Sequence, residues 1–403
     1  MAGSSAIGGA PSGRAFPDTN ASIAILADQL PTMNDAQMSF AVSHYVGTEK
    51  QLLPVTRALR AKNPDFIVLH YHLSMWQSAP ATDFIVDGKS WGNDYPTVTT
   101  HEDWFWHNTS NMRVPSSADQ KLLMNVSNPD FQAYWAKSLA DQVGAGEYDG
   151  IFFDSASPAL LQAECSAVDP RLAATGARDT QFNELGNQTW IEAWQAWMST
   201  LNATLAAEGI PLIPNTSAFV TSWDNTDYSL TAGAFVEGFA DTHFAESDWQ
   251  ASTSELLSLA AKDKLMILQN YLQDPSDVTT RMYYLGNYLL VKGHHTYLDY
   301  FSNAGPFEWY PEWELDLGAP TSSGSKAADL LEGGVYRRNF AKGSVLVNPS
   351  SAAVAVDLGG TFQRIVPNGG GAVDANGTAS GSVSMQPVTS LSVAATSAEI
   401  ILN

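Results

Sequence analysis

Residues 148–154 read Tyr-Asp-Gly-Ile-Phe-Phe-Asp, a short apolar run that begins after a glycine and ends at a carboxylate. The run 150–154 has the length and the residue types of a strand that is buried on both faces. A carboxylate at its end is costly to desolvate unless it has a partner or faces a cleft. Asp154 is therefore a candidate site residue, although with Ser155 and Pro158 nearby it could instead cap a following helix.

Similar apolar runs recur along the first three quarters of the chain, and helix-like stretches lie between them. The predicted strands are 23–27, 66–71, 121–125, 150–154, 211–215, 234–237, 265–269 and 295–300. The predicted helices include 49–61, 129–143, 183–208, 252–262 and 277–291. Trp190, Trp194 and Trp197 share one face of the third helix, and we interpret them as core. Eight strands alternating with helices predict an α/β fold of the (β/α)8 TIM-barrel type over residues 20–322.

The last quarter of the chain has a different charge balance. Residues 326–403 contain five basic and five acidic residues, so the whole formal charge of −22 belongs to residues 1–325. Residues 320–325, PTSSGS, have the composition of a linker. Short β-rich runs follow at 334–340, 344–348, 353–358, 362–366, 388–394 and 399–402. They predict a small antiparallel β-sandwich domain over residues 326–403.

Composition excludes several classes of partner. The 403 residues are 44% hydrophobic, and 42 acidic against 20 basic residues would repel nucleic acid and anionic membranes. No apolar run is long enough to span a membrane. The single cysteine, Cys165, has no partner for an internal disulfide and no motif for zinc. We interpret residues 1–19 as a flexible leader left by a trimmed export signal, which predicts a secreted or extracytoplasmic protein, and we expect no cofactor.

Polar residues gather at the ends of the predicted strands, which is where a barrel carries its active site. They are Asp28, His70, Tyr71, His72, Asn125, Asp154, Asn215, Glu237, Gln269, Asn270 and Asp299. Glu237 is a second strand-end carboxylate, and Gly238 after it leaves room for close approach. The strand that ends in Asn215 lies between the strands that end in Asp154 and Glu237. Cleavage of a glycosidic bond requires two carboxylates, and two that are separated by a single strand of the barrel can act on the same sugar.

Aromatic residues are frequent in the predicted loops at the same end of the barrel. Sugar rings stack their C–H faces on such side chains, so we expect Trp106 and Trp223 to contact a neutral carbohydrate substrate. Other aromatics in these loops are Trp76, Trp91, Trp104, Phe105, Trp249, Trp309, Tyr310 and Trp313.

Several blocks of the sequence resemble the glycosyl hydrolase-like family 15, a group distinct from the α-helical glucoamylases. The blocks are 125–131 (NVSNPDF), 148–155 (YDGIFFDS), 236–239 (VEGF), 345–350 (VLVNPS), 354–360 and 397–402. The resemblance extends over most of residues 20–403. It implies a catalytic TIM barrel followed by a small β domain, and by motif position it gives the catalytic roles to Asp154 and Glu237.

The sequence therefore predicts acid/base hydrolysis of an O-glycosidic bond, with Glu237 as proton donor and Asp154 as nucleophile or base. The other strand-end residues would bind the sugar. Retention or inversion of the anomeric centre depends on the separation of the carboxyl groups and stays open, as do the sugar, the linkage and the oligomeric state.

Two alternatives also stay open. His70 and His72 with Asp299 could form a metal-dependent amidohydrolase site, although strands four to six end in Asp154, Asn215 and Glu237 instead of the further histidines and lysine of that machinery. The same aromatic cleft could also bind a glycan without cutting it.

Overall fold

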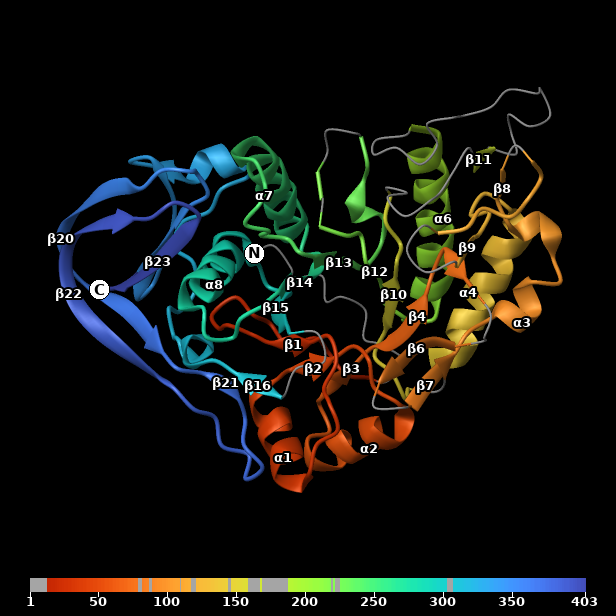
Figure 1. Cartoon of the computed structure of the whole chain (residues 1–403), viewed down its shortest axis with the longest axis horizontal. Helices are drawn as coiled ribbons and strands as arrows, with labels where there is room; N and C mark the ends of the chain where they lie inside the picture. Colours follow the sequence, from red (N-terminus) through yellow and green to blue (C-terminus); the bar gives the residue numbers. More distant parts are fainter. Residues whose placement is uncertain are drawn as a thin grey trace.

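The structure is a computed structural model, and it describes residues 13–78, 82–86, 89–108, 110–116, 121–143, 146–158, 167–168, 188–218, 220–221, 225–302 and 307–403. Parallel strands with helices between them make up the larger part, and an antiparallel sheet follows at the C-terminal end (Figure 1). The prediction of an α/β chain with parallel β–α units is confirmed at this level.

Eight strand positions are paired side by side in parallel and in chain order. They are β1 (Leu26–Ala27), β2 (Gly47–Thr48), β3 with β4 (Ile67–Val68 and His70–Leu73), β10 (Ile151–Asp154), β12 (Leu212–Pro214), β13 (Gly233–Glu237), β14 (Leu265–Tyr271) and β15 (Thr296–Phe301). Leu69 donates its N–H to Thr48 between β3 and β4, which are two stretches of one strand. Parallel bridges Asn215–Phe235 and Ile25–Leu298 join β12 to β13 and β15 to β1. The parallel pairing therefore closes from the last strand, β15, back to the first, β1. We call these eight positions the strand ring.

One predicted strand of the ring is wrong. Residues 121–125 contain only β9 (Leu122–Leu123), which pairs antiparallel with β5 (Trp76–Gln77) outside the ring. The position belongs instead to β2, which is two residues long and has no apolar run to reveal it. At Gly47 an added Cβ would lie 2.4 Å from the Ile67 carbonyl oxygen, so a glycine allows this close approach.

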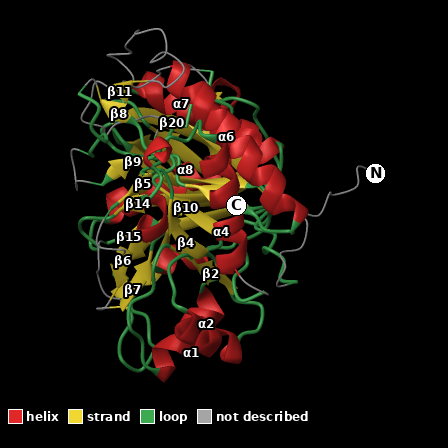
Figure 2. Cartoon of the chain, turned by 90° about the vertical axis from the view of Figure 1, so that its right-hand side faces the viewer, coloured by secondary structure: helices red, strands yellow, loops and turns green. Residues whose placement is uncertain are grey.

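Helices connect most of the ring strands and cover its outside (Figure 2). They are α1 (Asp35–His44), α2 (Leu53–Lys62), α3 (Tyr95–Val98), α4 (Pro129–Val143), α6 (Gln188–Ala207), α7 (Glu246–Ala261) and α8 (Val278–Val291). The 3-10 helices are Glu102–Trp104, Tyr228–Leu230, Pro311–Glu314 and Ala327–Leu330. The remaining short strands are β6 (Thr82–Val86), β7 (Lys89–Gly92), β8 (His107–Asn108) and β11 (Ala167–Val168).

Local sequence explains where these helices begin. Asn128 accepts hydrogen bonds from the N–H groups of Asp130 and Phe131 at the start of α4, and Asp277 caps α8. The tryptophans of α6 that we predicted to be core are fully buried. Helix α1, which precedes β2, was not predicted. No helix within the described ranges is long and apolar enough to cross a bilayer.

The inside of the strand ring is filled by alternate residues of its strands. The buried inner cluster is Ala24, Leu26, Ile67, Leu69, Tyr71, Phe152, Ile213, Phe235, Leu265, Ile267 and Tyr297, with Phe16 beside them. Phe16 packs against Tyr297, whose hydroxyl donates to the Pro17 carbonyl, and Arg14 pairs with Asp149. Residues 13–19 are thus packed against the ring, and the flexible leader predicted for 1–19 is wrong for them. Residues 1–12 lie outside the described residues.

The C-terminal residues form one six-stranded antiparallel sheet. Its order is β17 (Leu331–Glu332), β18 (Val335–Phe340), β19 (Gly343–Asn348), β23 (Ser397–Leu402), β20 (Val354–Asn368) and β22 (Ser382–Val393). The predicted runs 353–358 and 362–366 are parts of the single long strand β20, which has an irregularity between Asp357 and Phe362. Leu358, Leu391 and Val393 cluster with residues of β18, β19 and β23, so the expected sandwich takes the form of one bent sheet with its own small core. Short β16 (Glu308–Trp309) pairs with β21 (Gly371–Ala372) between the two parts of the chain.

Helix α8 joins the strand ring to this sheet. A Cβ added at Gly286 would lie 2.4 Å from the Cβ of Ala398, which shows how closely the helix and β23 approach. At the other end of the contact, Arg338 donates from one nitrogen to the carbonyls of Leu289, Leu290 and Lys292. In both contacts the C-terminal sheet approaches the backbone of α8 itself. This side of the helix is therefore covered by the sheet.

A buried ion pair lies at the same junction. Arg281 of α8 and Glu312 are both inaccessible to solvent, with Nε–Oε1 at 2.7 Å and Nη2–Oε2 at 3.2 Å. Arg281 also donates to the carbonyls of Pro275 and Gly369, and Gly369 lies in the connection between β20 and β21 of the C-terminal sheet. The guanidinium of Arg281 therefore binds three separate segments of the chain, at residues 275, 312 and 369.

We expect Glu312→Ala to lower the free energy of unfolding by about 3 kcal/mol, because it leaves a buried guanidinium without its counter-charge. Urea denaturation would measure the loss. Glu332→Ala removes an exposed carboxylate 3.5 Å from Arg337 and should cost less than about 1 kcal/mol. Equal losses in the two variants would contradict the importance of the buried pair.

Candidate functional site

Near the carboxyl ends of the ring strands, the inward-facing positions are occupied by polar side chains. Seven of them lie two residues beyond an inner-cluster residue or are themselves in that cluster, and Lys50 lies four residues beyond Val46, which packs against this cluster, so side-chain alternation directs all eight inward. We call these eight residues the inward polar set: Asp28, Lys50, Tyr71, Asp154, Asn215, Glu237, Gln269 and Asp299. One residue comes from each of the eight strand positions.

Asn215 joins the two predicted catalytic carboxylates. Its Nδ2 donates to Asp154 Oδ1 at 2.9 Å and to Glu237 Oε2 at 2.6 Å. Because one nitrogen reaches both oxygens, their separation is at most the sum of these distances, about 5.5 Å. The two acidic side chains, 83 positions apart in sequence, thus face a common space.

The surroundings fix the orientation of this group. The Ser217 N–H donates to Asn215 Oδ1, so both Nδ2 hydrogens remain for the carboxylates. Asp154 also accepts from the Tyr71 hydroxyl at 2.9 Å and from the Ser155 N–H at 2.8 Å. Ser155 and Ser217 have φ values of 54° and 70°, a strained conformation for serine that occurs where a site constrains the backbone.

The surroundings of the Glu237 carboxyl raise its pKa. Burial raises the pKa of Glu237 to about 7, and the nearby charge of Asp154 adds to the rise. The Asn215 hydrogen bond acts in the opposite direction. The Tyr271 hydroxyl, at the end of β14, also donates to Glu237 Oε1. A carboxyl group with this pKa exchanges its proton close to neutral pH.

A second polar group lies on the other side of Asp154. Lys50 Nζ pairs with Asp28 Oδ1 at 2.6 Å and lies 5.1 Å from the Phe152 ring centre. Burial alone would lower the pKa of Lys50, but the charges of Asp28 and Asp154 outweigh it and raise the pKa. Asp299 accepts from the Asp28 N–H at 3.1 Å, and burial followed by the charge of Asp28 raises the pKa of Asp299 to about 8.

Lys50 was not predicted from the sequence. It follows the short strand β2, which the apolar-run criterion missed, and its contacts place it beside residues that were predicted. A lysine two residues after a Gly-Thr pair gives no signal by itself. The strand alternation in the structure identifies it.

Two of the predicted site residues point away from the inside of the ring. His70 and His72 flank the inward Tyr71 and therefore point out of the ring, toward α4. His70 Nε2 lies 3.0 Å from Gln142 Oε1, and the His72 ring packs against Trp135. The predicted substrate contacts of both histidines are therefore wrong, and the pair cannot act together with Asp299 as the metal alternative required.

The predicted aromatic cleft is also wrong for the residues that the structure describes. Trp106 is fully buried and packs 6.4 Å from Trp190 between ring centres. The other tryptophans and aromatic residues of these loops that are described are buried as well, so they hold the loops on the scaffold. Trp223 lies outside the described residues. Asn125 is nearly buried and donates to the Asp103 carbonyl, which is a structural role away from the ring strands.

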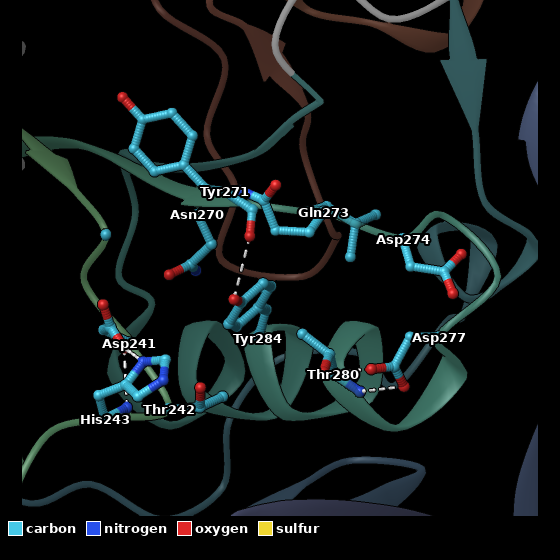
Figure 3. Close-up of a pocket in the computed structure, with 12 residues that line it drawn as sticks. Asp241, Thr242, His243, Asn270, Tyr271, Gln273, Asp274, Asp277, Thr280 and Tyr284 are labelled. Carbon is cyan, nitrogen blue, oxygen red and sulfur yellow. Dashed lines mark hydrogen bonds and ion pairs between the residues drawn. The ribbon is translucent and has the colours of Figure 1, made fainter.

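Two further predicted residues have a buried polar atom without a hydrogen-bond partner among the described residues, and one of them lies beside Glu237. Gln269 pairs in register with Glu237, and its Oε1 has no hydrogen-bond partner among the described residues. Asn270, the next residue, points outward instead and lines a pocket between the end of β14 and α8 (Figure 3).

The chain was compared with models of protein families. Residues 60–344 match the model of "Hypothetical glycosyl hydrolase family 15". The chain belongs to this family. The matched range contains six members of the inward polar set and leaves out Asp28 and Lys50, which precede it.

The solved structures that match this chain include an α-amylase, an α-galactosidase and an α-L-fucosidase. A noncanonic maltogenic α-amylase from Thermotoga neapolitana is 11% identical, with 96% of this chain and 97% of that chain covered and a TM-score of 0.45. An α-galactosidase from Geobacillus stearothermophilus is 10% identical, with 97% and 57% covered and a TM-score of 0.47. An α-L-fucosidase from Paenibacillus thiaminolyticus is 10% identical, with 70% and 46% covered and a TM-score of 0.41.

This chain spans less than two thirds of the length of the galactosidase and of the fucosidase. No curated protein matches the chain. Family membership therefore rests on the family model, and the similarities to solved structures say nothing about the sugar.

Proposed function

We propose that this member of the family hydrolyses O-glycosidic bonds of a neutral carbohydrate at the mouth of a (β/α)8 barrel, with retention of the anomeric configuration. Asp154 is the nucleophile and Glu237 is the acid and base. The observation that carries the proposal is the single Asn215 amide that binds both carboxyl groups. Carboxyl groups about 5 to 5.5 Å apart suit a double displacement, whereas inversion needs roughly 6.5 to 9.5 Å for a water molecule between them.

The proposed reaction has two steps. In the first, Glu237 gives its proton to the glycosidic oxygen, the bond from that oxygen to the anomeric carbon breaks, and an Asp154 oxygen bonds to the carbon. In the second, Glu237 takes a proton from water, the water oxygen bonds to the anomeric carbon, and Asp154 leaves as a carboxylate. Glu237 then carries a proton again, so the enzyme returns to its first state.

The rest of the inward polar set would hold the sugar and the nucleophile in place. Three hydrogen bonds orient Asp154, from Tyr71, Asn215 and the Ser155 backbone. The Asp28–Lys50 pair offers an acceptor and a donor side by side, an arrangement that suits neighbouring sugar hydroxyl groups.

A panel of 4-nitrophenyl α- and β-glycosides of common neutral hexoses, pentoses and N-acetylhexosamines tests the proposal. Release of 4-nitrophenol from at least one member is expected, and NMR of the first product formed should show the anomer of the substrate. Inversion would contradict the roles given to the carboxyl groups. Binding of a glycan with no hydrolysis of any glycoside would favour the non-catalytic alternative.

The pH dependence of kcat/KM follows from the raised pKa of Glu237. The donor must hold its proton in the free enzyme, so kcat/KM should fall as pH rises through about 7. The measurement is kcat/KM from pH 5 to 9 with an alkyl glycoside of the sugar that the panel identifies, because an alkoxide leaving group needs the proton of the acid.

Asn215→Leu provides the comparison, because it removes the hydrogen bond that lowers the pKa of Glu237. The alkaline limb should move to higher pH in this variant, with a lower maximum because both carboxyl groups lose their shared donor. A limb that stays in place would mean that another group controls it.

A further inference from the structure

Two aromatic side chains lie above the inward polar set, at the carboxyl ends of β14 and β15. Tyr271 and Phe301 are partners in the register of these strands, as are Gln269 and Asp299 two residues before them. Side chains two residues apart on a strand share a face, so Tyr271 and Phe301 also point to the inside of the ring. Figure 3 shows the Tyr271 ring directed away from α8, the helix outside β14. The two rings therefore lie one layer nearer to the mouth than Gln269 and Asp299.

Tyr271 is open to solvent at this mouth. Its side chain is 38% exposed, and no other Phe, Tyr or Trp side chain that the structure describes is as exposed. Phe301 is half-buried, and its ring centre lies 5.8 Å from that of Tyr271 with the ring planes at 73°. We call these two rings the aromatic wall. The wall offers an apolar surface where the predicted loop tryptophans do not.

Hydrogen bonds hold the aromatic wall in place. The Tyr284 hydroxyl of α8 donates to the Tyr271 carbonyl at 3.1 Å, and the Leu272 N–H donates to the Phe301 carbonyl at 3.0 Å. At its other end, the Tyr271 side chain donates its hydroxyl to Glu237 Oε1. A ring that is fixed at its backbone and at its hydroxyl loses little conformational entropy when a ligand covers it.

The order of the ring strands places Tyr271 on the side of Glu237 away from Asp154. Asp154, Asn215, Glu237 and Tyr271 come from four successive strands of the ring, β10, β12, β13 and β14. Asn215 binds Glu237 Oε2, whereas Tyr271 binds Oε1. In the proposed reaction the anomeric carbon lies at Asp154 and the oxygen of the leaving group lies at Glu237. A leaving group bonded to that oxygen therefore continues past Glu237 toward Tyr271 and the open mouth.

We propose that Tyr271 is a specificity-determining residue for the leaving group, and that its ring, with Phe301, binds a sugar unit through the apolar C–H face of that unit. The inference rests on the proposed function and deepens it. A pyranose ring such as glucose covers an aromatic side chain, whereas a methyl group covers little of it. The Tyr271 hydroxyl has a separate part, because it positions the carboxyl group of Glu237.

The test uses three substrates that share the sugar identified by the aryl-glycoside panel. They are its glycosyl fluoride, its methyl glycoside and the disaccharide in which it is linked to glucose. The methyl glycoside and the disaccharide both release an alkoxide that needs the proton of Glu237, so they differ by the glucose ring. Their ratio of kcat/KM therefore measures what the enzyme gains from that ring.

Three variants separate the ring of Tyr271 from its hydroxyl. Tyr271→Phe loses the hydroxyl alone, and Tyr271→Ala loses the hydroxyl and the ring, so the first is the reference for the second. Met385→Ala is the control, because it removes an exposed apolar side chain from β22 of the C-terminal sheet.

We expect the wild type to prefer the disaccharide over the methyl glycoside at least about ten-fold in kcat/KM. Tyr271→Phe and Met385→Ala should keep this preference, and Tyr271→Ala should lower it to less than about three-fold. The glycosyl fluoride has no ring in its leaving group, so its kcat/KM should agree within about two-fold between Tyr271→Phe and Tyr271→Ala.

Tyr271→Phe should also change the dependence of kcat/KM on pH. A hydrogen bond donated to an ionised carboxylate lowers its pKa, so loss of the hydroxyl should raise the pKa of Glu237. The donor must hold its proton, so the alkaline limb for the methyl glycoside should move to higher pH. Asp154, Asp28 and Lys50, whose charges also act on Glu237, are unchanged in this variant. A limb that does not move would overturn the positioning role of the hydroxyl.

A wild-type ratio near one, or a high ratio that persists in Tyr271→Ala, would overturn the aromatic wall as the site of the leaving group. An equal loss on all three substrates from Tyr271→Phe to Tyr271→Ala would also overturn it, because the ring would then serve the sugar at Asp154 or the fold. In these outcomes the wild type still hydrolyses the fluoride, so the proposed function stands. A wild type that hydrolyses none of the three substrates overturns the proposed function and this inference with it.

Discussion

Asp154→Asn should lower kcat roughly 10⁴-fold, because the variant has no carboxylate to form the bond with the anomeric carbon. The side chain keeps its size and its oxygen still accepts hydrogen bonds, so substrate binding should persist. Initial rates with the aryl glycoside and binding by calorimetry measure the two effects separately. A variant that retained more than about a tenth of the wild-type rate would remove Asp154 from the chemistry.

Two companion variants sharpen this experiment. Asp65→Asn changes an exposed aspartate in the same way and should keep full activity. Asp154→Ala leaves space for a small nucleophile, and added azide should then convert the glycosyl fluoride into a glycosyl azide of opposite configuration. Azide product identifies the residue that attacks the sugar, since no purely structural aspartate would be replaced in this manner.

Glu237→Gln should have an effect that depends on the leaving group. Substrates with a sugar or alkyl leaving group need its proton, so their kcat should fall about 10³-fold. The glycosyl fluoride needs no proton to depart, and its first step should lose less than about ten-fold. The second step still lacks a base, so a burst of fluoride equal to the enzyme concentration should precede a slow steady rate.

The dependence of kcat/KM on pH tests the role of Glu237 independently. In Glu237→Gln the alkaline limb near pH 7 should vanish, because the group with that pKa is gone. Glu208→Gln, on an exposed position after α6, should leave rates and profile unchanged. Equal losses on the fluoride and on the disaccharide would show that Glu237 does not act through the leaving group.

Much of the ring could be predicted because buried parallel strands are apolar on both faces and end abruptly. Gly150 to Asp154 and Ala234 to Glu237 are such runs, and the polar residue at each end lies among the inward polar set. The rule failed at Gly47–Thr48, since two residues are too few to form a run. With β2 missing, Lys50 had no strand to place it.

Side-chain direction was the second limit. At the carboxyl end of a ring strand, only every second side chain points into the ring. The sequence does not say which of the two alternating sets of residues this is. Tyr71 lies inside, whereas His70 and His72 lie outside against α4, although all three are polar and consecutive. Tryptophans in loops gave a third error, because Trp106 packs on α6 and is not accessible to a sugar. Their hydrophobic area is large enough to hold loops in place, which outweighs any use as a binding surface here.

The contact of α8 with the C-terminal sheet has a practical consequence for anyone who trims this gene. Gly286 packs closely against Ala398, and Arg281 donates to the Gly369 carbonyl, so a product that stops near residue 322 would expose an apolar flank of α8 to water and lose one hydrogen bond of Arg281. Expression of the shortened protein should yield inclusion bodies, and the protein is best produced with all of its β-rich C-terminal residues.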